Sequence, residues 1–340
     1  MKRTISLFLI LAMLLSCAIL FTGCSKKIDP EYPVTVGGVS VDKEPQKIVV
    51  LSDALADVIA YIDYDYKIVG RSLACDQDYL NSIPSVGPAS DPSVDVMVSR
   101  GADLVIADST LPAAVRSRIA DAGIPFAILD NAKDADGLKT LYTDLGTLLG
   151  GAVTGSKKGD RGYKKLTTLF TEYKSGSADV VKTAVYLYLD SDGQLCTFTK
   201  DSFEQKIFNS NGAMNIFRNQ TGAPVDPVEL RMASPTCIFY DDERVIETLR
   251  SDERLMNLRA LKEGRCLSIP LKNIYRYGVT CEETVYAMED FLLLTDTASP
   301  DEPTDPEPTD DESSVDDSYT DDAYVDDSYD GYDDYYDGDY

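Results

Sequence analysis

Short apolar runs alternate with helix-like stretches between residues 45 and 151. A buried strand reads as a continuous apolar run, whereas a helix repeats its apolar positions every three to four residues. Alternation of the two predicts a parallel sheet with helices on both faces. The strands are expected at 47–51, 67–70, 85–88, 102–107 and 125–129, and the helices at 54–62, 93–100, 111–122 and 135–149.

A longer amphipathic stretch follows at residues 152–175, with lysines on its polar face. A helix of this length spans roughly 35 Å, about the width of a small domain. We expect it to connect two lobes; an ordinary surface helix within one domain is the alternative. Its glycines are expected to weaken the first turns. The apolar positions at helical spacing are Tyr163, Leu166, Phe170 and Tyr173, and the glycines are Gly155, Gly159 and Gly162.

A second α/β pattern occupies residues 176–296. The segment 190–193 is typical of a tight hairpin turn between two strands. The pattern predicts a second lobe of the same class as the first, which occupies residues 45–151. Its strands are expected at 182–189, 195–198, 236–240 and 265–270, and its helices at 202–211, 227–232, 242–250, 254–258 and 282–293.

The N-terminal segment, residues 1–23, has two basic residues followed by an apolar run, as in a secretory signal peptide. Leu20–Cys24 resembles the lipobox of bacterial lipoproteins. The resemblance implies cleavage before Cys24 and attachment of lipid to that residue, and acyl chains anchor a protein to a membrane. A secreted protein cleaved nearby is the alternative. Residues 24–44 are expected to form a polar tether.

The C-terminal segment, residues 297–340, is called the acidic tail below. It contains no Lys or Arg and repeats Asp-Asp with interspersed Tyr, and it contributes much of the chain's formal net charge of −26. Low hydrophobicity with dense like charge predicts disorder. Its use is open between a solvating extension, weak cation collection and contact with a basic partner.

The composition excludes several classes of function. Histidine is absent, which removes the commonest general base and metal ligand. The acidity disfavours nucleic acid as a partner. Nucleophile-elbow, phosphate-loop and dinucleotide-binding motifs are absent from the sequence. These observations argue against an enzyme.

Several short sequence motifs, taken in their order along the chain, resemble those of the helical-backbone class of ABC-transporter substrate-binding proteins. Proteins of this class capture iron–siderophore complexes, haem or cobalamin. The likeness extends over about residues 45–295 and follows the lipobox. The matching phrases are PQKIVVLS at 45–52, KIVG at 67–70, SVG at 85–87, GADLVIAD at 101–108, GIPFAIL at 123–129, DLGTLLGG at 144–151, NGAMNIF at 211–217, SPTCIFY at 234–240 and LKEGRCLSIP at 261–270.

The resemblance implies two Rossmann-like α/β lobes with parallel sheets, joined by one long helix, with a ligand cleft between them. In such folds ligands bind at the carboxyl ends of the strands. Asp95 and Glu229 match positions that dock onto the permease; the alternative is that each is a solvated helix charge. The ligand-binding residues are then expected among Ser52, Asp53, Arg71, Ser72, Gly87, Pro88, Asp108, Ser109, Thr110, Thr199, Lys200, Tyr240, Asp241, Tyr275, Arg276 and Tyr277.

We therefore expect a monomeric lipoprotein on the extracytoplasmic face of the cell membrane. It captures an iron–siderophore or a cobalamin-type corrinoid and delivers it to an ABC permease and its ATPase. Arginines would suit an anionic chelate, whereas tyrosines would suit a flat macrocycle. No resident cofactor or protein-bound metal is expected, because the chelate brings its own. The alternative is a surface interaction protein with a degenerate cleft and a functional acidic tail.

Overall fold

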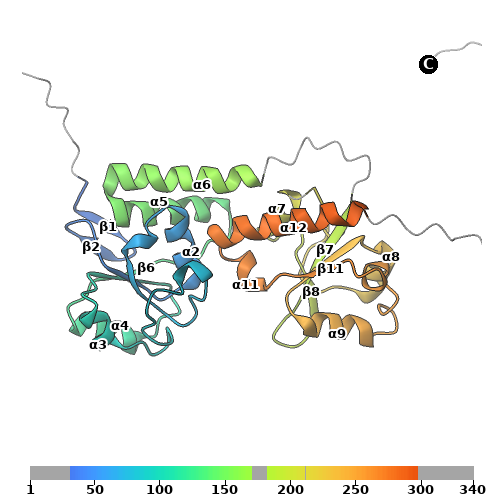
Figure 1. Ribbon diagram of the computed structural model, residues 1–340, viewed down its shortest axis with the longest axis horizontal. Coiled ribbons are helices and arrows are strands. Elements are labelled where there is room, and N and C mark those ends of the chain that lie inside the picture. The colour runs from blue at the N-terminus through green and yellow to red at the C-terminus, as the bar shows by residue number, and fades with distance from the viewer. Residues whose placement is uncertain (1–30, 171–181, 211, 298–340) are drawn as a thin grey trace, which may run out of the picture. The chain divides into compact units, whose positions relative to one another are not determined.

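The computed structural model describes residues 31–170, 182–210 and 212–297 (Figure 1). The expected signal peptide, the expected lipidation site Cys24, residues 171–175 of the predicted connecting helix and residues 298–340 of the acidic tail lie outside the described residues. Two α/β lobes follow each other along the chain, which confirms the predicted fold class. Within the described residues, no helix has the length and apolar character needed to cross a membrane.

The N-terminal lobe contains a four-stranded parallel sheet in the order β4-β3-β5-β6. Every residue of the central strands β3 and β5 is buried, so their continuous apolar sequences match sheet faces covered on both sides. Ser85 adds an isolated parallel bridge to Arg71 where a strand is predicted over 85–88. The strands are β3 (Ile48–Val50), β4 (Ile68–Arg71), β5 (Leu104–Ala107) and β6 (Phe126–Ile128).

Helices cover this sheet close to their predicted positions. Gly123, at φ 71°, stands just after α4, in a left-handed conformation that suits glycine and ends the helix. Two short 3-10 helices, η1 (Asp65–Lys67) and η2 (Asp78–Leu80), flank β4. The α-helices are α2 (Asp53–Tyr61), α3 (Val94–Ser99), α4 (Ala113–Asp121) and α5 (Ala135–Gly150).

The prediction of a polar tether over 24–44 is wrong for residues 34–41. These residues form a hairpin of β1 (Val34–Val36) and β2 (Val39–Val41), whose turn is Gly37-Gly38 at φ 59° and 79°. The backbone N–H of Ile128 donates to the Gly37 carbonyl oxygen at 2.9 Å, which ties the turn to β6. The hairpin's inward valines are buried in the core of the lobe.

The connecting stretch is also shorter than predicted. A π-helical turn, η3 (Gly151–Gly155), links α5 to α6 (Ser156–Leu169), and the two helices lie antiparallel, side by side (Figure 1). A Cβ on Gly146 would overlap the Gly155 carbonyl oxygen, and a Cβ on Gly159 would overlap that of Tyr142. The glycines expected only to weaken this helix therefore allow it to pack closely on α5.

The C-terminal lobe contains a five-stranded sheet in the order β11-β10-β7-β8, with β9 also paired to β7. The strands β9, β10 and β11 run parallel to their neighbours, whereas β8 returns antiparallel after the predicted 190–193 turn. The strands are β7 (Thr183–Leu189), β8 (Leu195–Thr197), β9 (Met214–Asn215), β10 (Cys237–Tyr240) and β11 (Cys266–Ser268).

The helices of this lobe match the predictions except near residue 256 and at α11 (Leu271–Ile274), which was not predicted. Residues 254–258 form turns, and the helical residues follow later, in α10. The first residues of α12 precede the predicted start at 282. The helices are α7 (Gln205–Ser210), α8 (Pro227–Ala233), α9 (Glu243–Ser251), α10 (Arg259–Lys262), α11 (Leu271–Ile274) and α12 (Val279–Thr297).

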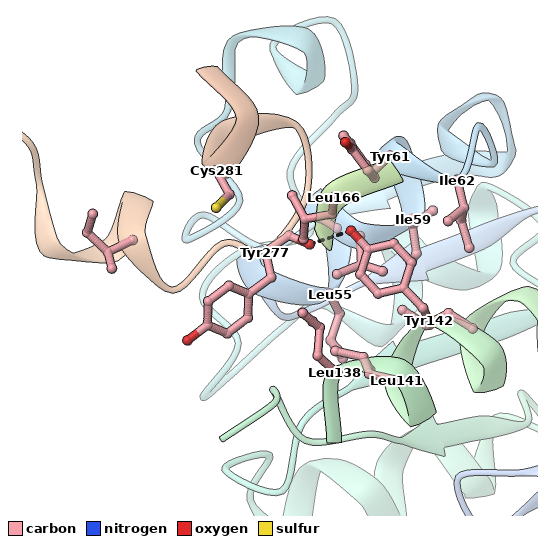
Figure 2. Close-up of a cluster of buried hydrophobic side chains, with 14 of the residues drawn as sticks. Leu55, Ile59, Tyr61, Ile62, Leu138, Leu141, Tyr142, Leu166, Tyr277 and Cys281 are labelled. Carbon is pink, nitrogen blue, oxygen red and sulfur yellow. Dashed lines mark hydrogen bonds between the residues drawn. The ribbon is translucent and has the colours of Figure 1, made fainter. Parts of the chain in front are cut away.

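Residues 275–280, here called the crossing segment, run from the end of α11 into the first residues of α12 and enter the core of the N-terminal lobe. The Tyr142 hydroxyl on α5 donates to the Tyr277 carbonyl oxygen at 2.6 Å (Figure 2). Both tyrosines are fully buried, among leucines of α2 and α5. The two lobes are therefore joined at a second place, distant in sequence from α6.

Candidate functional site

Four predicted loops of the N-terminal lobe lie at the carboxyl ends of its parallel strands. Ser52 occupies the N-cap position of α2 just after β3, without a side-chain capping bond; Arg71 ends β4, Gly87 follows the bridge residue Ser85, and Asp108 follows β5. Strands of one parallel sheet present these ends at one edge, so the fold brings the loops together. The adjoining predicted residues in these loops are Asp53, Ser72, Pro88, Ser109 and Thr110.

Arg71 uses its guanidinium inside the protein. Nε donates to the carbonyl oxygens of Leu80 and Ile83, both at 3.0 Å, and Nη1 donates to that of Cys75 at 2.8 Å. These bonds hold the loop that follows β4. Ser72 is fully buried, and its hydroxyl lies 3.4 Å from the Cys75 sulfur. Both predicted residues thus shape the loop.

The loop after β5 is ordered by carboxylates. The Asp108 carboxylate accepts from the backbone N–H of Thr110 at 3.0 Å and from its hydroxyl. Asp130, at the end of the neighbouring strand, accepts from the Ser109 N–H at 2.9 Å. Hydrogen bonding to Ser109 lowers the pKa of the Asp130 carboxyl. Ser109 and Thr110 remain exposed beside these carboxylates.

The predicted residues of the C-terminal lobe differ in accessibility. Thr199 is buried and Lys200 is exposed in the loop after β8. The Tyr240 hydroxyl donates to Glu243 at 3.0 Å, and the Asp241 carboxylate accepts from the N–H of Leu271 at 2.7 Å. Asp241 therefore anchors the start of α11, which leads into the crossing segment.

The crossing segment places three predicted residues between the lobes. Asn131 donates to the Tyr275 carbonyl oxygen at 2.6 Å, and the Tyr277 hydroxyl donates to Glu204 at 2.8 Å. Tyr277 is buried, whereas the Tyr275 side chain is 36% exposed. Of the two, Tyr275 is the side chain with surface available to a ligand.

Arg276 and Asp53 are brought together directly. Nε and Nη2 of Arg276 lie 3.0 and 2.9 Å from Asp53 Oδ2, and Nη2 lies 2.5 Å from Asp76 Oδ1. Lys272 also pairs with Asp76. Burial alone would raise the pKa of the Asp76 carboxyl, but hydrogen bonds from Lys272 and Arg276 outweigh burial and lower it.

Asp57, on the second turn of α2, holds the start of α12. Its carboxylate accepts from the Thr280 hydroxyl at 2.6 Å, from the Thr280 N–H at 3.1 Å and from the Tyr79 hydroxyl at 3.0 Å. Burial raises the pKa of Asp57 to about 6 despite these bonds and despite the nearby Arg276. A carboxylate of one lobe thus anchors the crossing segment.

Sequence reasoning missed four residues at this site. Asp76 and Asn131 contact the crossing segment, but partners 144 or 200 positions away leave no local signal. Leu73, just after β4 and so at the same edge of the sheet as the predicted loops, is 59% exposed. Tyr188 is half-buried near the end of β7, with its ring 5.7 Å from that of Phe198.

The two predicted docking acids lie on short helices of different lobes. Asp95 is exposed on the first turn of α3, which Ser93 caps. Glu229 is exposed on the first turn of α8, which Asp226 caps, and it accepts from Gln220 at 2.9 Å. Both carboxylates are accessible. Across the described ranges, the His, Cys, Asp and Glu side chains form no group of three or more able to hold a metal ion.

A model of the periplasmic binding protein family matches residues 48–272. The uncharacterized ABC transporter substrate-binding lipoprotein YvrC of Bacillus subtilis (strain 168) is 25% identical over 291 residues, which cover 78% of this chain and 91% of YvrC. The Fe(3+) dicitrate-binding periplasmic protein FecB of Escherichia coli (strain K12) is 32% identical over 117 residues, which cover 30% of this chain and 38% of FecB.

Solved structures share the fold at low sequence identity. A possible iron-binding protein of Staphylococcus epidermidis ATCC 12228 has a TM-score of 0.58 at 15% identity, with 74% of this chain and 99% of that chain covered. The periplasmic haem-binding protein HutB of Vibrio cholerae has a TM-score of 0.57 at 13% identity, covering 73% and 98%. The chain belongs to the periplasmic binding protein family, in the helical-backbone class of ABC-transporter substrate-binding proteins, and it binds a substrate rather than catalysing a reaction.

Proposed function

We propose that this protein captures a metal chelate in the cleft between its lobes, and that the ligand is a near-neutral, cobalamin-type corrinoid. The choice of a near-neutral ligand rests on the two predicted arginines, because both guanidinium groups already have partners within the protein. Arg71 donates to backbone carbonyls, and Arg276 pairs with two aspartates. An anionic chelate would have to displace one of these internal partners, at a cost in desolvation and lost hydrogen bonds.

Apolar and aromatic side chains support the same ligand. Tyr275 and Leu73 expose surface on segments that follow β11 and β4, and Tyr188 lies near the end of β7. Tyrosine rings stack well on flat macrocycles, and a hydroxyl at the ring edge can bond to a neutral amide. A corrinoid offers a flat macrocycle edged by amides.

An iron–siderophore is the second candidate. FecB is named as a protein that binds Fe(3+) dicitrate, and its similarity to part of this chain favours an iron chelate. Lys200 is exposed at the C-terminal lobe and would suit an anionic group. In either case we propose that any metal arrives within the chelate and that the protein contributes no resident cofactor.

The protein would be attached to the membrane and would deliver its ligand to a permease. YvrC is a lipoprotein by name, which supports lipid attachment at Cys24 and a place on the extracytoplasmic face of the membrane. The exposed Asp95 and Glu229 would dock onto basic residues of the permease, one from each lobe. The receptor would act as a monomer.

Titration of the mature protein tests the ligand. The chain contains 21 tyrosines and no tryptophan, so tyrosine fluorescence reports binding of an absorbing ligand. Cobalamin, haem and ferric siderophores would be titrated with correction for absorbance, and calorimetry would confirm each hit. Saturable sub-micromolar binding of cobalamin alone is expected. Binding of a ferric siderophore alone would overturn the corrinoid assignment, and no binding across the panel would favour an interaction protein acting through its acidic tail.

A further inference from the structure

A buried carboxylate lies beside the proposed ligand contacts. Glu204 directly precedes α7 in the C-terminal lobe and is only 8% exposed. The Tyr277 hydroxyl donates to its Oε1 at 2.8 Å, and the ring of the neighbouring Phe203 packs edge-on against the Tyr277 ring, with 5.3 Å between their centroids. The crossing segment therefore holds Glu204 in a fixed place at the junction of the lobes.

One oxygen of this carboxylate is available to a ligand. Tyr277 is the only hydrogen-bond donor to the carboxylate among the described residues, and no cation there pairs with it. Three buried side-chain oxygens lack a partner in the described ranges, and Glu204 Oε2 is not one of them, so this oxygen keeps accessible surface. A mostly buried charge without a cation costs free energy, and a glutamine would accept the same bond from Tyr277. The fold alone therefore gives no reason for a charge at this position.

Glu204 acts on the two tyrosines of the proposed ligand site. Burial is the main cause that raises the pKa of Tyr188 to about 12 and raises the pKa of Tyr275, and the negative charge of Glu204 adds to both. Because the Coulomb energy of two charges falls with their separation, both rings lie near the carboxylate. Neither tyrosine hydroxyl has a hydrogen-bond partner within the part of the chain that the structure describes, so each can still donate.

The carboxylate and the two hydroxyls together match a carboxamide. An amide N–H can donate to Glu204 while the amide carbonyl oxygen accepts from a tyrosine hydroxyl. An ammonium group would pair with the carboxylate but offers no acceptor to the hydroxyls. A ligand carboxylate would accept from the hydroxyls, but it would lie against a like charge in partly buried surroundings, which is unfavourable.

We propose that Glu204 is a specificity-determining residue of the ligand site. Its free oxygen accepts an N–H of a carboxamide at the edge of the bound chelate, and its charge excludes ligands that carry a carboxylate there. Tyr188 or Tyr275 donates to the carbonyl oxygen of the same amide. This inference rests on the proposed chelate-binding function and deepens it, because it names the group on the ligand that the protein selects.

Cyanocobalamin and its monocarboxylic acids are matched probes, because hydrolysis of one amide to a carboxylate leaves the rest of the corrinoid unchanged. Calorimetry with the mature protein is expected to show that at least one monocarboxylic acid binds about tenfold or more weakly than cyanocobalamin. In Glu204→Gln, this ratio should fall to about one or below, because the charge is lost and the side chain can donate an N–H while still accepting from Tyr277. Glu247→Gln, the same change on the exposed face of α9, should keep the ratio of the parent.

A second pair of probes separates the role of Glu204 from the corrinoid assignment. N-acetylferrioxamine B ends in a neutral amide, whereas N-succinylferrioxamine B carries an additional carboxylate on the same ferric chelate. If only the ferrioxamines bind, a preference of the parent for the acetyl form that Glu204→Gln removes would support the role of Glu204 and refute the corrinoid. An unchanged preference would refute both, as would the absence of binding by either pair.

If the cobalamin probes bind and their affinity ratio is equal in the parent and Glu204→Gln, the role of Glu204 is refuted and the chelate function stands. A crystal structure of the parent with the probe that binds decides the matter even if Glu204→Gln does not fold. It should show an amide nitrogen within hydrogen-bond distance of Glu204 Oε2, and a water there instead would refute the proposal.

Discussion

Arg276 directs two nitrogen atoms to one carboxylate oxygen of Asp53, at 3.0 and 2.9 Å, although the residues stand 223 positions apart. Asp53 begins α2 in the N-terminal lobe, and Arg276 belongs to the crossing segment that leaves the C-terminal lobe. With only 4% of the Arg276 side chain exposed, this pair is the most enclosed ion pair between the lobes among the described residues.

Replacing Arg276 with methionine should destabilise the protein. The change leaves Asp53 and Asp76 without their shared partner, and loss of one member of a buried pair typically costs 3–5 kcal/mol. Because both aspartates are partly exposed, we expect about 2 kcal/mol in urea unfolding. Arg100→Met, an exposed site with the same charge change, should cost under about 0.5 kcal/mol. Equal losses at the two sites would show that the interlobe pair contributes nothing specific.

Asp57 should make stability depend on pH in an unusual direction. Its pKa is raised to about 6 in the folded protein, from 3.8, so the native state binds a proton more tightly than the unfolded state. Its contribution to stability therefore rises as the pH falls from 7 towards 4, by about 2 kcal/mol. The measurement is the free energy of unfolding of the parent protein and Asp57→Asn across that range.

The difference in free energy of unfolding between the parent protein and Asp57→Asn isolates the contribution of the Asp57 carboxyl, because the other acidic groups titrate in both proteins. As the pH falls, the free energy of unfolding of the parent is expected to rise relative to that of Asp57→Asn. Asp121→Asn, at an exposed position, should follow the parent at every pH. Parallel curves for the parent and Asp57→Asn would show that Asp57 does not titrate in this range.

Gly146→Ala should disrupt the packing of α5 on α6. An added Cβ would overlap the Gly155 carbonyl, and backbone cannot give way as a flexible side chain does. We expect a loss of about 1–3 kcal/mol, seen as a lower urea midpoint, against a helix-propensity gain of under about 1 kcal/mol. In Gly137→Ala on the same helix, the nearest atom to the added Cβ is a side-chain oxygen of Asp134 at 3.2 Å, and stability should change by less than about 1 kcal/mol. A stable Gly146→Ala would contradict the close packing of the two helices.

Tyr275 should contribute to chelate affinity through its ring. Tyr275→Ser is expected to weaken cobalamin about tenfold, whereas Tyr275→Phe keeps the stacking surface and loses little. Tyr66→Ser is the control, because Tyr66 is 70% exposed in η1, before β4 and so at the opposite edge of the sheet. Should Tyr275→Ser bind cobalamin as tightly as the parent, this ring does not contact the ligand. Calorimetry measures the affinity for cobalamin of the parent and of the three variants.

The strands and helices were largely predictable because their signals are local. The apolar run at 47–51 predicted a strand where the structure has β3, and the helical spacing of apolar residues over 135–149 predicted α5. The hairpin at 34–41 was missed although its valines alternate with polar residues around Gly37-Gly38, a pattern typical of a hairpin. That error came from interpreting the segment by composition alone.

The sequence by itself determined the α/β class, the two successive lobes and the loops that end the strands, because apolar period and turn residues act over a few neighbours. Only the tertiary structure decided what the loop residues do. It paired Arg276 with Asp53, turned Arg71 towards backbone carbonyls and buried Tyr277, because each outcome depends on partners brought together from different parts of the chain. It also buried Gln77 Oε1 without a hydrogen-bond donor among the described residues, an outcome that no single stretch of the sequence encodes.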